Sequence, residues 1–137
     1  MSWLLDVNFI LASRWTTHPD HQKAKAWLDS AAGFYTCAIS ELGFVRISLS
    51  GAYGAAWNDV QESLKKLHAH SGHQFLADDV KGTDAAETGS NDTTDAHLVS
   101  LAKRHGLKLA TLDAKLAGKP WAAGVAGNPL PHSPKSS

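Results

Sequence analysis

The chain opens with Trp3-Leu4-Leu5-Asp6-Val7-Asn8, a short apolar run that ends abruptly at a carboxylate. The run before Asp6 predicts a buried strand, and Val7, Ile10 and Leu11 then follow at the spacing of one helix face. A strand, an acid and a helix in this order are typical of the carboxyl end of a strand in an α/β sheet. The same order recurs further along the chain.

Two later strands are also followed by an acid. Residues 34–38 predict a buried strand, after which Ser40 is expected to cap a helix that carries Glu41 in its first turn. Residues 107–111 predict another strand, and Asp113 follows its end. These acids are therefore expected near the first one.

Helices are predicted between the strands. Asp95 falls in the first turn of a helix that Thr93 or Thr94 caps and that runs to His105. The other predicted elements are a helix at 18–31 capped by Thr17, a helix at 56–70, a strand at 74–76, a loop at 78–91, a short helix ending at Leu116 and an edge strand at Val125.

Strands that alternate with helices predict an α/β fold with a mostly parallel sheet and helices on both faces. A length of 137 residues fits one domain, which we expect at 1–128, followed by a flexible tail at 129–137. Ligands of such sheets bind outside the carboxyl ends of the strands. Four acids are expected to converge there, namely Asp6, Glu41, Asp95 and Asp113.

Composition excludes several classes of protein. Lys plus Arg and Asp plus Glu both total 13, so the net charge of zero argues against a protein that coats RNA through a basic surface. Cys37 is the single cysteine, which excludes an internal disulfide and favours a reducing, cytoplasmic location. No apolar run is long enough to cross a membrane, so we expect no membrane partner.

Converging carboxylates favour a metal site. They repel one another, and at neutral pH a hard divalent cation relieves that repulsion. Mg²⁺ or Mn²⁺ takes oxygen ligands and completes its shell with water and substrate phosphate oxygens, which suits phosphodiester hydrolysis. Taken singly, Glu41 and Asp95 have a simpler explanation, because the helix dipole favours a carboxylate in a first turn, and Asp6 could be a turn residue. The four acids together favour metal binding.

Four short motifs carry these acids, and they resemble the motifs of PIN domains of the VapC-toxin type. The resemblance extends from about Trp3 to Leu116, and the Gly- and Ala-rich sequence after Asp113 departs from it. The motifs are Leu4-Leu5-Asp6-Val7-Asn8, Ile39-Ser40-Glu41-Leu42-Gly43-Phe44-Val45-Arg46, Thr94-Asp95-Ala96-His97-Leu98 and Ala110-Thr111-Leu112-Asp113.

The resemblance implies a three-layer α/β/α sandwich with strand order 3-2-1-4-5. It also implies an endoribonuclease that depends on Mg²⁺ or Mn²⁺, acts as a toxin and is covered by the carboxy-terminal segment of a VapB-type antitoxin. By motif match, the metal ligands and catalytic acids are Asp6, Glu41, Asp95 and the more variable Asp113, supported by Asn8 and Thr111.

Arg46 and the histidines leave alternatives open. Arg46 is either a phosphate contact at the rim of the cleft or an internal partner of a carboxylate. Eight histidines, His68, His70 and His73 among them, suggest a zinc site. Structural zinc usually recruits cysteine as well, so surface histidines are favoured instead.

Two amphipathic helices and two rival functions complete the sequence-based expectations. The helices at 18–31 and 56–70 are expected in the core, with a homodimer or an antitoxin groove as further uses. One rival is a PIN-fold interaction module or RNA-binding protein without cleavage, which Mg²⁺ titration distinguishes. A phosphatase is disfavoured because Asp6-Val7-Asn8 lacks the second acid of an Asp-x-Asp pair.

Overall fold

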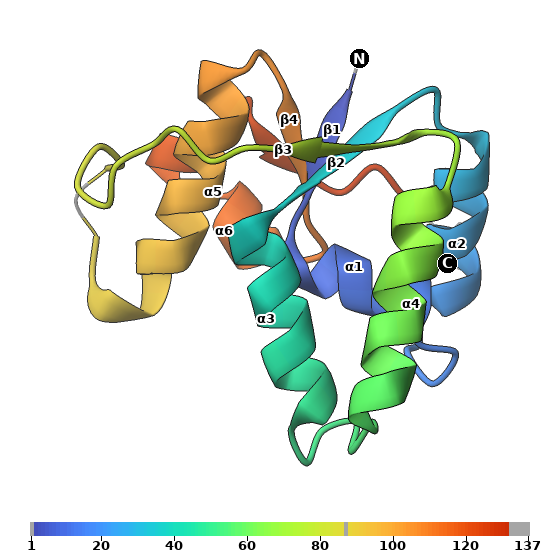
Figure 1. The fold of residues 1–137 in the computed structure, drawn as a ribbon. Coiled ribbons are helices and arrows are strands. Elements are labelled where there is room, and N and C mark those ends of the chain that lie inside the picture. Colours follow the sequence, from blue (N-terminus) through green and yellow to red (C-terminus); the bar gives the residue numbers. More distant parts are fainter. Residues whose placement is uncertain (1, 87, 132–137) are drawn as a thin grey trace, which may run out of the picture.

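The computed structural model describes residues 2–86 and 88–131 (Figure 1). Five strands form one sheet in the order β3-β2-β1-β4-β5, and every pairing between neighbours is parallel. This confirms the expected α/β fold and strand order. The strands are β1 (Trp3–Leu5), β2 (Phe34–Cys37), β3 (His73–Leu76), β4 (Lys108–Ala110) and β5 (Ala126–Gly127).

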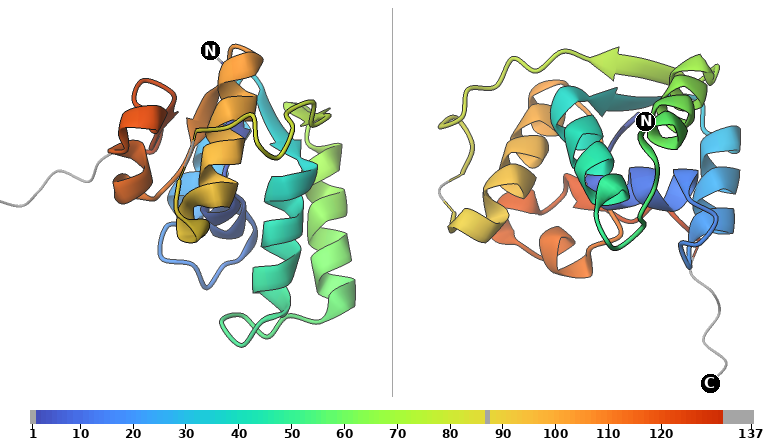
Figure 2. Two further views of the ribbon diagram at one scale, coloured as in Figure 1. Left: turned by 90° about the vertical axis from the view of Figure 1, so that its left-hand side faces the viewer. Right: turned by 60° about the horizontal axis from the view of Figure 1, so that its bottom comes forward.

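The helices connect the strands, and within the described residues none is long and apolar enough to cross a membrane. The loop between α3 and α4 projects away from the sheet in both figures (Figures 1 and 2). The α-helices are α1 (Val7–Arg14), α2 (His21–Ser30), α3 (Ala38–Leu49), α4 (Trp57–Ala69), α5 (Thr93–Arg104) and α6 (Ala114–Ala117), with 3-10 turns η1 (Ser90–Asp92) and η2 (Pro120–Ala122).

Both faces of the sheet are covered, which gives the three layers expected. Successive residues of a strand point to opposite faces, so Leu5 and Ala110 belong to one core, and Leu4 and Leu109 belong to the other. Helices α1, α2, α3 and α4 supply the first core, whereas α5 and α6 supply the second. The carboxyl ends of the central strands β1 and β4 are therefore held from both sides.

Three helices begin at residues other than those predicted. Asp20, and not Thr17, is the N-cap of α2, because its carbonyl accepts the first helical bond from Ala24 at 2.9 Å. Cys37 is the N-cap of α3, and Ser40 is its third residue, whose hydroxyl accepts from the Cys37 N–H at 3.1 Å. Similarly, Asp92 precedes α5, so Thr93 is already helical.

The loop predicted at 78–91 is fastened to α5 at its start. Val80 is buried in the second core, Asp78 pairs with His97 at 2.5 Å, and Asp79 pairs with Arg104 and His105 at 3.1 and 2.9 Å. The one helical turn in this region is η1. These contacts hold the amino-terminal half of the loop against the side of α5.

The carboxy-terminal region packs further than the sequence indicates. The last strand, β5, begins one residue after Val125 and pairs with β4. Leu130 is buried in the first core, so packing continues at least to that residue. The end of the tail predicted at 129–137, residues 132–137, lies outside the described residues.

Candidate active site

Asp6 is the most buried acid of the chain's described part, with 4% of its surface exposed. It follows β1 directly and is the N-cap of α1, where its Oδ1 accepts the Val7 N–H at 2.8 Å. Its own N–H donates to the Ala110 carbonyl of β4 at 2.9 Å. The strand pairing thus fixes the carboxylate at the junction of β1, β4 and α1.

Thr111 joins the other oxygen of Asp6 to β4. The buried Thr111 hydroxyl donates to Asp6 Oδ2 at 2.8 Å and accepts from Asn8 Nδ2 and the Asp113 N–H, both at 3.1 Å. Asn8 Oδ1 in turn accepts the Leu112 N–H at 3.0 Å. The two residues that the motifs marked as supports therefore hold Asp6 and the backbone before Asp113 in one network.

Asp95 and Asp113 complete a group of three aspartates. Asp95 lies in the first turn of α5, and Asp113 is the N-cap of α6, where its Oδ1 accepts the N–H groups of Lys115 and Leu116 at 2.9 and 3.2 Å. Within the described residues no lysine or arginine forms an ion pair with any of the three aspartates. Their negative charges therefore have no basic partner.

The electrostatics of Asp95 and Asp6 reflect this crowding. Burial, followed by the negative charges of Asp6, Asp113 and Asp92, raises the pKa of Asp95 to about 6. Burial also raises the pKa of Asp6, and the charge of Asp113 adds to this, against the lowering effect of hydrogen bonds from Thr111 and Val7. The site favours neutralisation of its carboxylates, by protons or by a cation.

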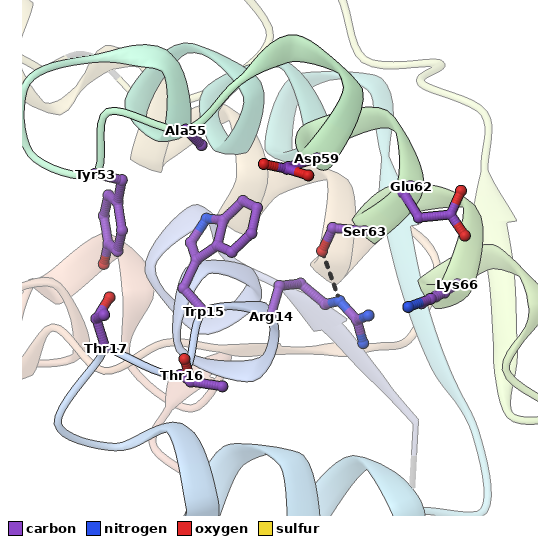
Figure 3. Close-up of a pocket in the computed structure, with 10 residues that line it drawn as sticks. All are labelled: Arg14, Trp15, Thr16, Thr17, Tyr53, Ala55, Asp59, Glu62, Ser63 and Lys66. Carbon is purple, nitrogen blue, oxygen red and sulfur yellow. Dashed lines mark hydrogen bonds between the residues drawn. The ribbon is translucent and has the colours of Figure 1, made fainter.

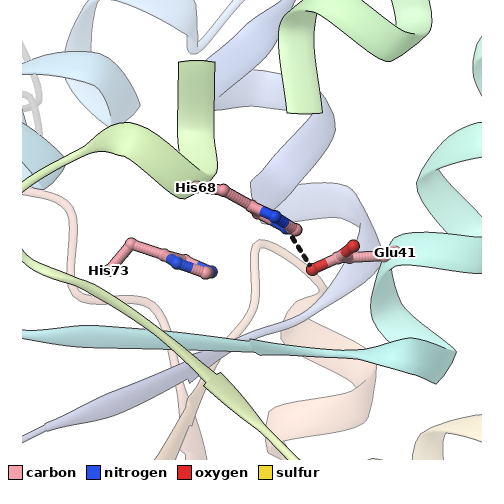
Figure 4. A group of neighbouring side chains, drawn as sticks. All are labelled: Glu41, His68 and His73. Carbon is pink, nitrogen blue, oxygen red and sulfur yellow. Dashed lines mark hydrogen bonds and ion pairs between the residues drawn. The ribbon is translucent and has the colours of Figure 1, made fainter. Parts of the chain in front are cut away.

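Glu41 lies in the first turn of α3 as predicted, but its carboxylate contacts other residues (Figure 4). Glu41 Oε2 accepts from the Thr36 hydroxyl at 2.6 Å and lies 2.8 Å from His68 Nε2. His73 lies in the same group. Glu41 is not among the charges that raise the pKa of Asp6 or Asp95.

Arg46 lies at the edge of a shallow pocket beside Asp95. The pocket measures about 390 Å³ and is lined by α3 residues, Arg46 included, and by Thr94, the neighbour of Asp95. The Arg46 side chain is exposed, and among the described residues no carboxylate pairs with it. Of the two alternatives from the sequence, this position fits a contact with an external anion.

A separate cavity of about 420 Å³ lies between the end of α1 and α4 (Figure 3). Arg14 in this cavity donates to the Ser63 hydroxyl at 3.0 Å. Asp6 is at the other end of α1, and eight helical residues span roughly 12 Å. The cavity is therefore not part of the aspartate site.

Comparison with known proteins identifies the family. The family model of the PIN domain matches residues 3–121. The chain belongs to the PIN-domain family. Ribonuclease VapC38 of Mycobacterium tuberculosis is 42% identical to it over 81% of this chain and 84% of that protein. Ribonuclease VapC39 of the same species is 36% identical over 85% and 92%.

Solved structures share the PIN-domain architecture. A chain of VapBC2 from Rickettsia felis, bound to a DNA fragment from its promoter, superimposes with a TM-score of 0.60 at 18% identity, covering 93% of this chain and 98% of that chain. A chain of FitAB bound to the IR36 DNA fragment gives 0.62 at 23% identity, covering 96% and 99%. At this level of identity the likeness concerns the fold.

In this PIN domain the sequence missed the contacts of the fourth acid. The charges of Asp6 and Asp113 act on Asp95, whereas Glu41 contacts Thr36 and His68. That these acids bind a metal stays a prediction. The only signal in the sequence is the histidine group that includes His68 and His73, and its spacing does not indicate that these histidines contact Glu41.

Proposed function

We propose that this PIN domain is an endoribonuclease, the toxin of a VapBC toxin-antitoxin pair, and that it depends on Mg²⁺ or Mn²⁺. The observation that carries the proposal is the group Asp6, Asp95 and Asp113, three acids at the carboxyl edge of the sheet that pair with no lysine or arginine of the described residues. The VapC ribonucleases to which the chain is similar support RNA as the substrate.

The three aspartates fit a hard divalent cation. They offer only oxygen donors, which Mg²⁺ and Mn²⁺ prefer, and the pKa of Asp95 is raised first by burial and then by negative charge that such an ion offsets. When bound, the ion supplies a water of lowered pKa and neutralises charge on the phosphodiester. Asp6, Asp95 and Asp113 would hold it.

The chain's own residues orient the acids and bind the RNA backbone. Thr111 and Asn8 keep Asp6 in one rotamer, because Thr111 donates to its Oδ2 and Asn8 donates to Thr111. Arg46, exposed beside the pocket that Thr94 lines, would bind a phosphate of the substrate with its guanidinium. With zero net charge, such local contacts replace a basic surface.

Substitution of single aspartates tests the proposal. Asp6→Asn and Asp95→Asn should abolish Mg²⁺-dependent cleavage of RNA, since each removes a carboxylate ligand at nearly constant volume. Asp59→Asn is a matched control, because Asp59 also lies in a first helical turn but on the exposed surface of α4. Wild-type cleavage rates in both Asp6→Asn and Asp95→Asn would refute the assignment. Mg²⁺ binding without cleavage would favour the interaction module instead.

The partners follow from the same comparison and complete the proposal. We infer a VapB-type antitoxin, a homodimer and a cytoplasmic site of action. Large apolar side chains on α3 and α4 support protein contacts there, since Leu42, Leu49 and Trp57 are exposed. Co-purification with the product of an adjacent small gene, and light scattering of the toxin alone, test the two assemblies.

A further inference from the structure

A glutamate and two histidines converge at the edge of the sheet, on three different elements. One carboxylate oxygen of Glu41 and one ring nitrogen each of His68 and His73 all lie within 4.8 Å of one another. We propose that Glu41, His68 and His73 form a second cation site that binds a divalent transition metal of the Zn²⁺ class (Figure 4). This site shares Glu41 with the acids that the sequence motifs predict to be catalytic, whereas His68 and His73 lie outside that set.

The two imidazoles lie next to one another and close to Glu41. The rings of His68 and His73 are stacked, with centroids 4.7 Å apart and planes at 14°. Figure 4 shows both rings directed toward Glu41, and His68 Nε2 already lies 2.8 Å from Glu41 Oε2. Because an imidazole nitrogen binds a metal in the plane of its ring, one of the two stacked rings has to turn before both nitrogens reach one ion, and the partly exposed His68 side chain has room for that turn.

Thr36 contacts two of the three proposed ligands. This buried threonine on β2 has its hydroxyl 2.6 Å from Glu41 Oε2 and 2.7 Å from His73 Nε2. The hydroxyl has one proton, so an ion bound by His73 Nε2 would replace one of these two contacts, and the hydrogen bond to Glu41 would remain as the outer contact that orients this ligand. The parallel pairing of β2 with β3 places Thr36 opposite Phe75 and so beside His73. The site is therefore built on the sheet.

The donor set selects a different ion from the aspartate site. Two imidazoles and one carboxylate are a ligand set that Zn²⁺ uses when it keeps a fourth, open position, whereas Mg²⁺ prefers oxygen alone. Ligand atoms of a tetrahedral Zn²⁺ site lie roughly 3.3 Å apart. No pair here therefore has to close by more than about 1.5 Å. The His68 side chain, 44% exposed at the last turn of α4, has the freedom to do so.

The site is separated from the aspartates. His73 lies on β3 and Asp6 follows β1, with β2 between them, a spacing of roughly 10 Å for two strand intervals. Occupation of this site would hold Glu41 on the β3 side of α3. An ion bound here can therefore be distinguished from one held by Asp6, Asp95 and Asp113.

Calorimetric titration of the full chain with Zn²⁺, in the presence of excess Mg²⁺, tests the proposal. We expect one equivalent of Zn²⁺ to bind, and His68→Gln and His73→Gln to weaken its affinity at least ten-fold. His105→Gln is the matched control, because His105 also contacts a carboxylate, Asp79, at 2.9 Å, on another side of the molecule. The Zn²⁺ affinities of His105→Gln and of Asp95→Asn should equal that of the wild type.

Several outcomes would overturn the second site. Unchanged Zn²⁺ affinity in His68→Gln would do so, and so would a loss in Asp95→Asn or His105→Gln that equals the loss in the two ligand variants. His68 is partly exposed, so His68→Gln should fold even if His73→Gln does not, and its near-UV circular dichroism checks this. With Co²⁺ as a probe, a visible spectrum indicating two nitrogen ligands supports the site, and an all-oxygen octahedral spectrum contradicts it.

Discussion

Thr111 acts on Asp6 through a single hydroxyl, which makes it a positioning residue. Thr111→Val keeps the volume but removes the donor to Asp6 Oδ2 and the acceptor of Asn8. We expect the kcat for RNA cleavage to fall about 10- to 100-fold, as when outer partners of metal ligands are lost, with little change in KM. Steady-state kinetics of the purified protein measures both.

Thr111→Ser separates this role from a general loss of stability. It restores the hydroxyl but not the methyl group, so it should recover most of kcat while remaining less stable than the wild type. Thr111→Val should lower the free energy of unfolding by about 1–3 kcal/mol, because Asp6 is left buried with one hydrogen bond fewer. Equal kcat values for the Val and Ser variants would contradict positioning through the hydroxyl.

Asp95 should make the metal-free protein less stable as the pH rises. Its folded pKa of about 6 lies above the ordinary value of 3.8, so the folded state holds the proton more tightly between these values. Its contribution is thus complete below about pH 4 and lost above about pH 6. Because the side chain is half-exposed, we expect on the order of 1 kcal/mol from this shift.

Asp95→Asn removes the titrating carboxyl group, so comparison with the wild type measures how much Asp95 changes the free energy of unfolding. In chelator-treated protein at about pH 8, the variant should be more stable than the wild type by on the order of 1 kcal/mol, and the gap should close near pH 4. Urea unfolding at the two pH values measures the difference. Asp59→Asn is again the control, and a gap that does not depend on pH would contradict the electrostatic origin.

At the scale of elements, α3 packs closely on the start of α1 through Gly43. A Cβ at this position would lie 2.5 Å from Val7 Cγ2 and 3.1 Å from Val7 Cγ1, so no simple rotation of Val7 makes room. Overpacking costs about 1–3 kcal/mol, against a gain of about 1 kcal/mol in helix propensity from Gly to Ala. Gly43→Ala should therefore destabilise the protein by on the order of 1 kcal/mol in urea unfolding.

The effect of Gly43→Ala on the free energy of unfolding should change sign when Val7 is shortened. In a Val7→Ala background the contact is absent, so Gly43→Ala keeps only its propensity gain and should be neutral or stabilising. A double-mutant cycle measures the coupling between the two positions. Equal effects of Gly43→Ala in both backgrounds would show that the helices are not in contact there.

Sequence patterns located the elements and three of the four acids for a local reason. Asp6 directly follows β1, Asp113 comes three residues after the end of β4, and Asp95 lies in the first turn of α5, so chain position alone placed these residues near one edge of the sheet. The partners of Glu41 depend instead on contacts distant in the sequence. His68 comes from α4 and His73 from β3, and only the assembled β2–β3 pairing brings them to this carboxylate.

The predicted first residues of two helices were wrong for a related reason. Ser40 and Thr17 have the residue types of N-caps, but the N-caps of the two helices are Cys37 and Asp20, each three residues away. In α3 the hydroxyl of Ser40 bonds back to Cys37 from inside the helix, and in α2 the carbonyl of Asp20 accepts the first helical bond. The spacing of apolar residues predicts where a helix lies, whereas its first residue depends on which nearby group accepts the first backbone hydrogen bonds.

At the scale of the whole molecule, a divalent cation should link the two halves of the fold and stabilise it. The aspartates follow β1 and β4 and open α5, so an ion held by all three binds the folded state and not the unfolded chain. At about 100 times its dissociation constant, Mg²⁺ should contribute about 2.7 kcal/mol, or roughly 8–10 °C in Tm for a domain of this size.

Thermal unfolding at increasing Mg²⁺, against Na⁺ at matched ionic strength, separates site binding from charge screening. Screening alone would act similarly in both salts, because it depends on ionic strength. Asp95→Asn should lose most of the Mg²⁺ response, whereas His68→Gln should keep it, since His68 lies on α4, outside the aspartate group. If the wild-type Tm rises equally in the two salts, the aspartates do not hold the ion, and their crowding needs another explanation.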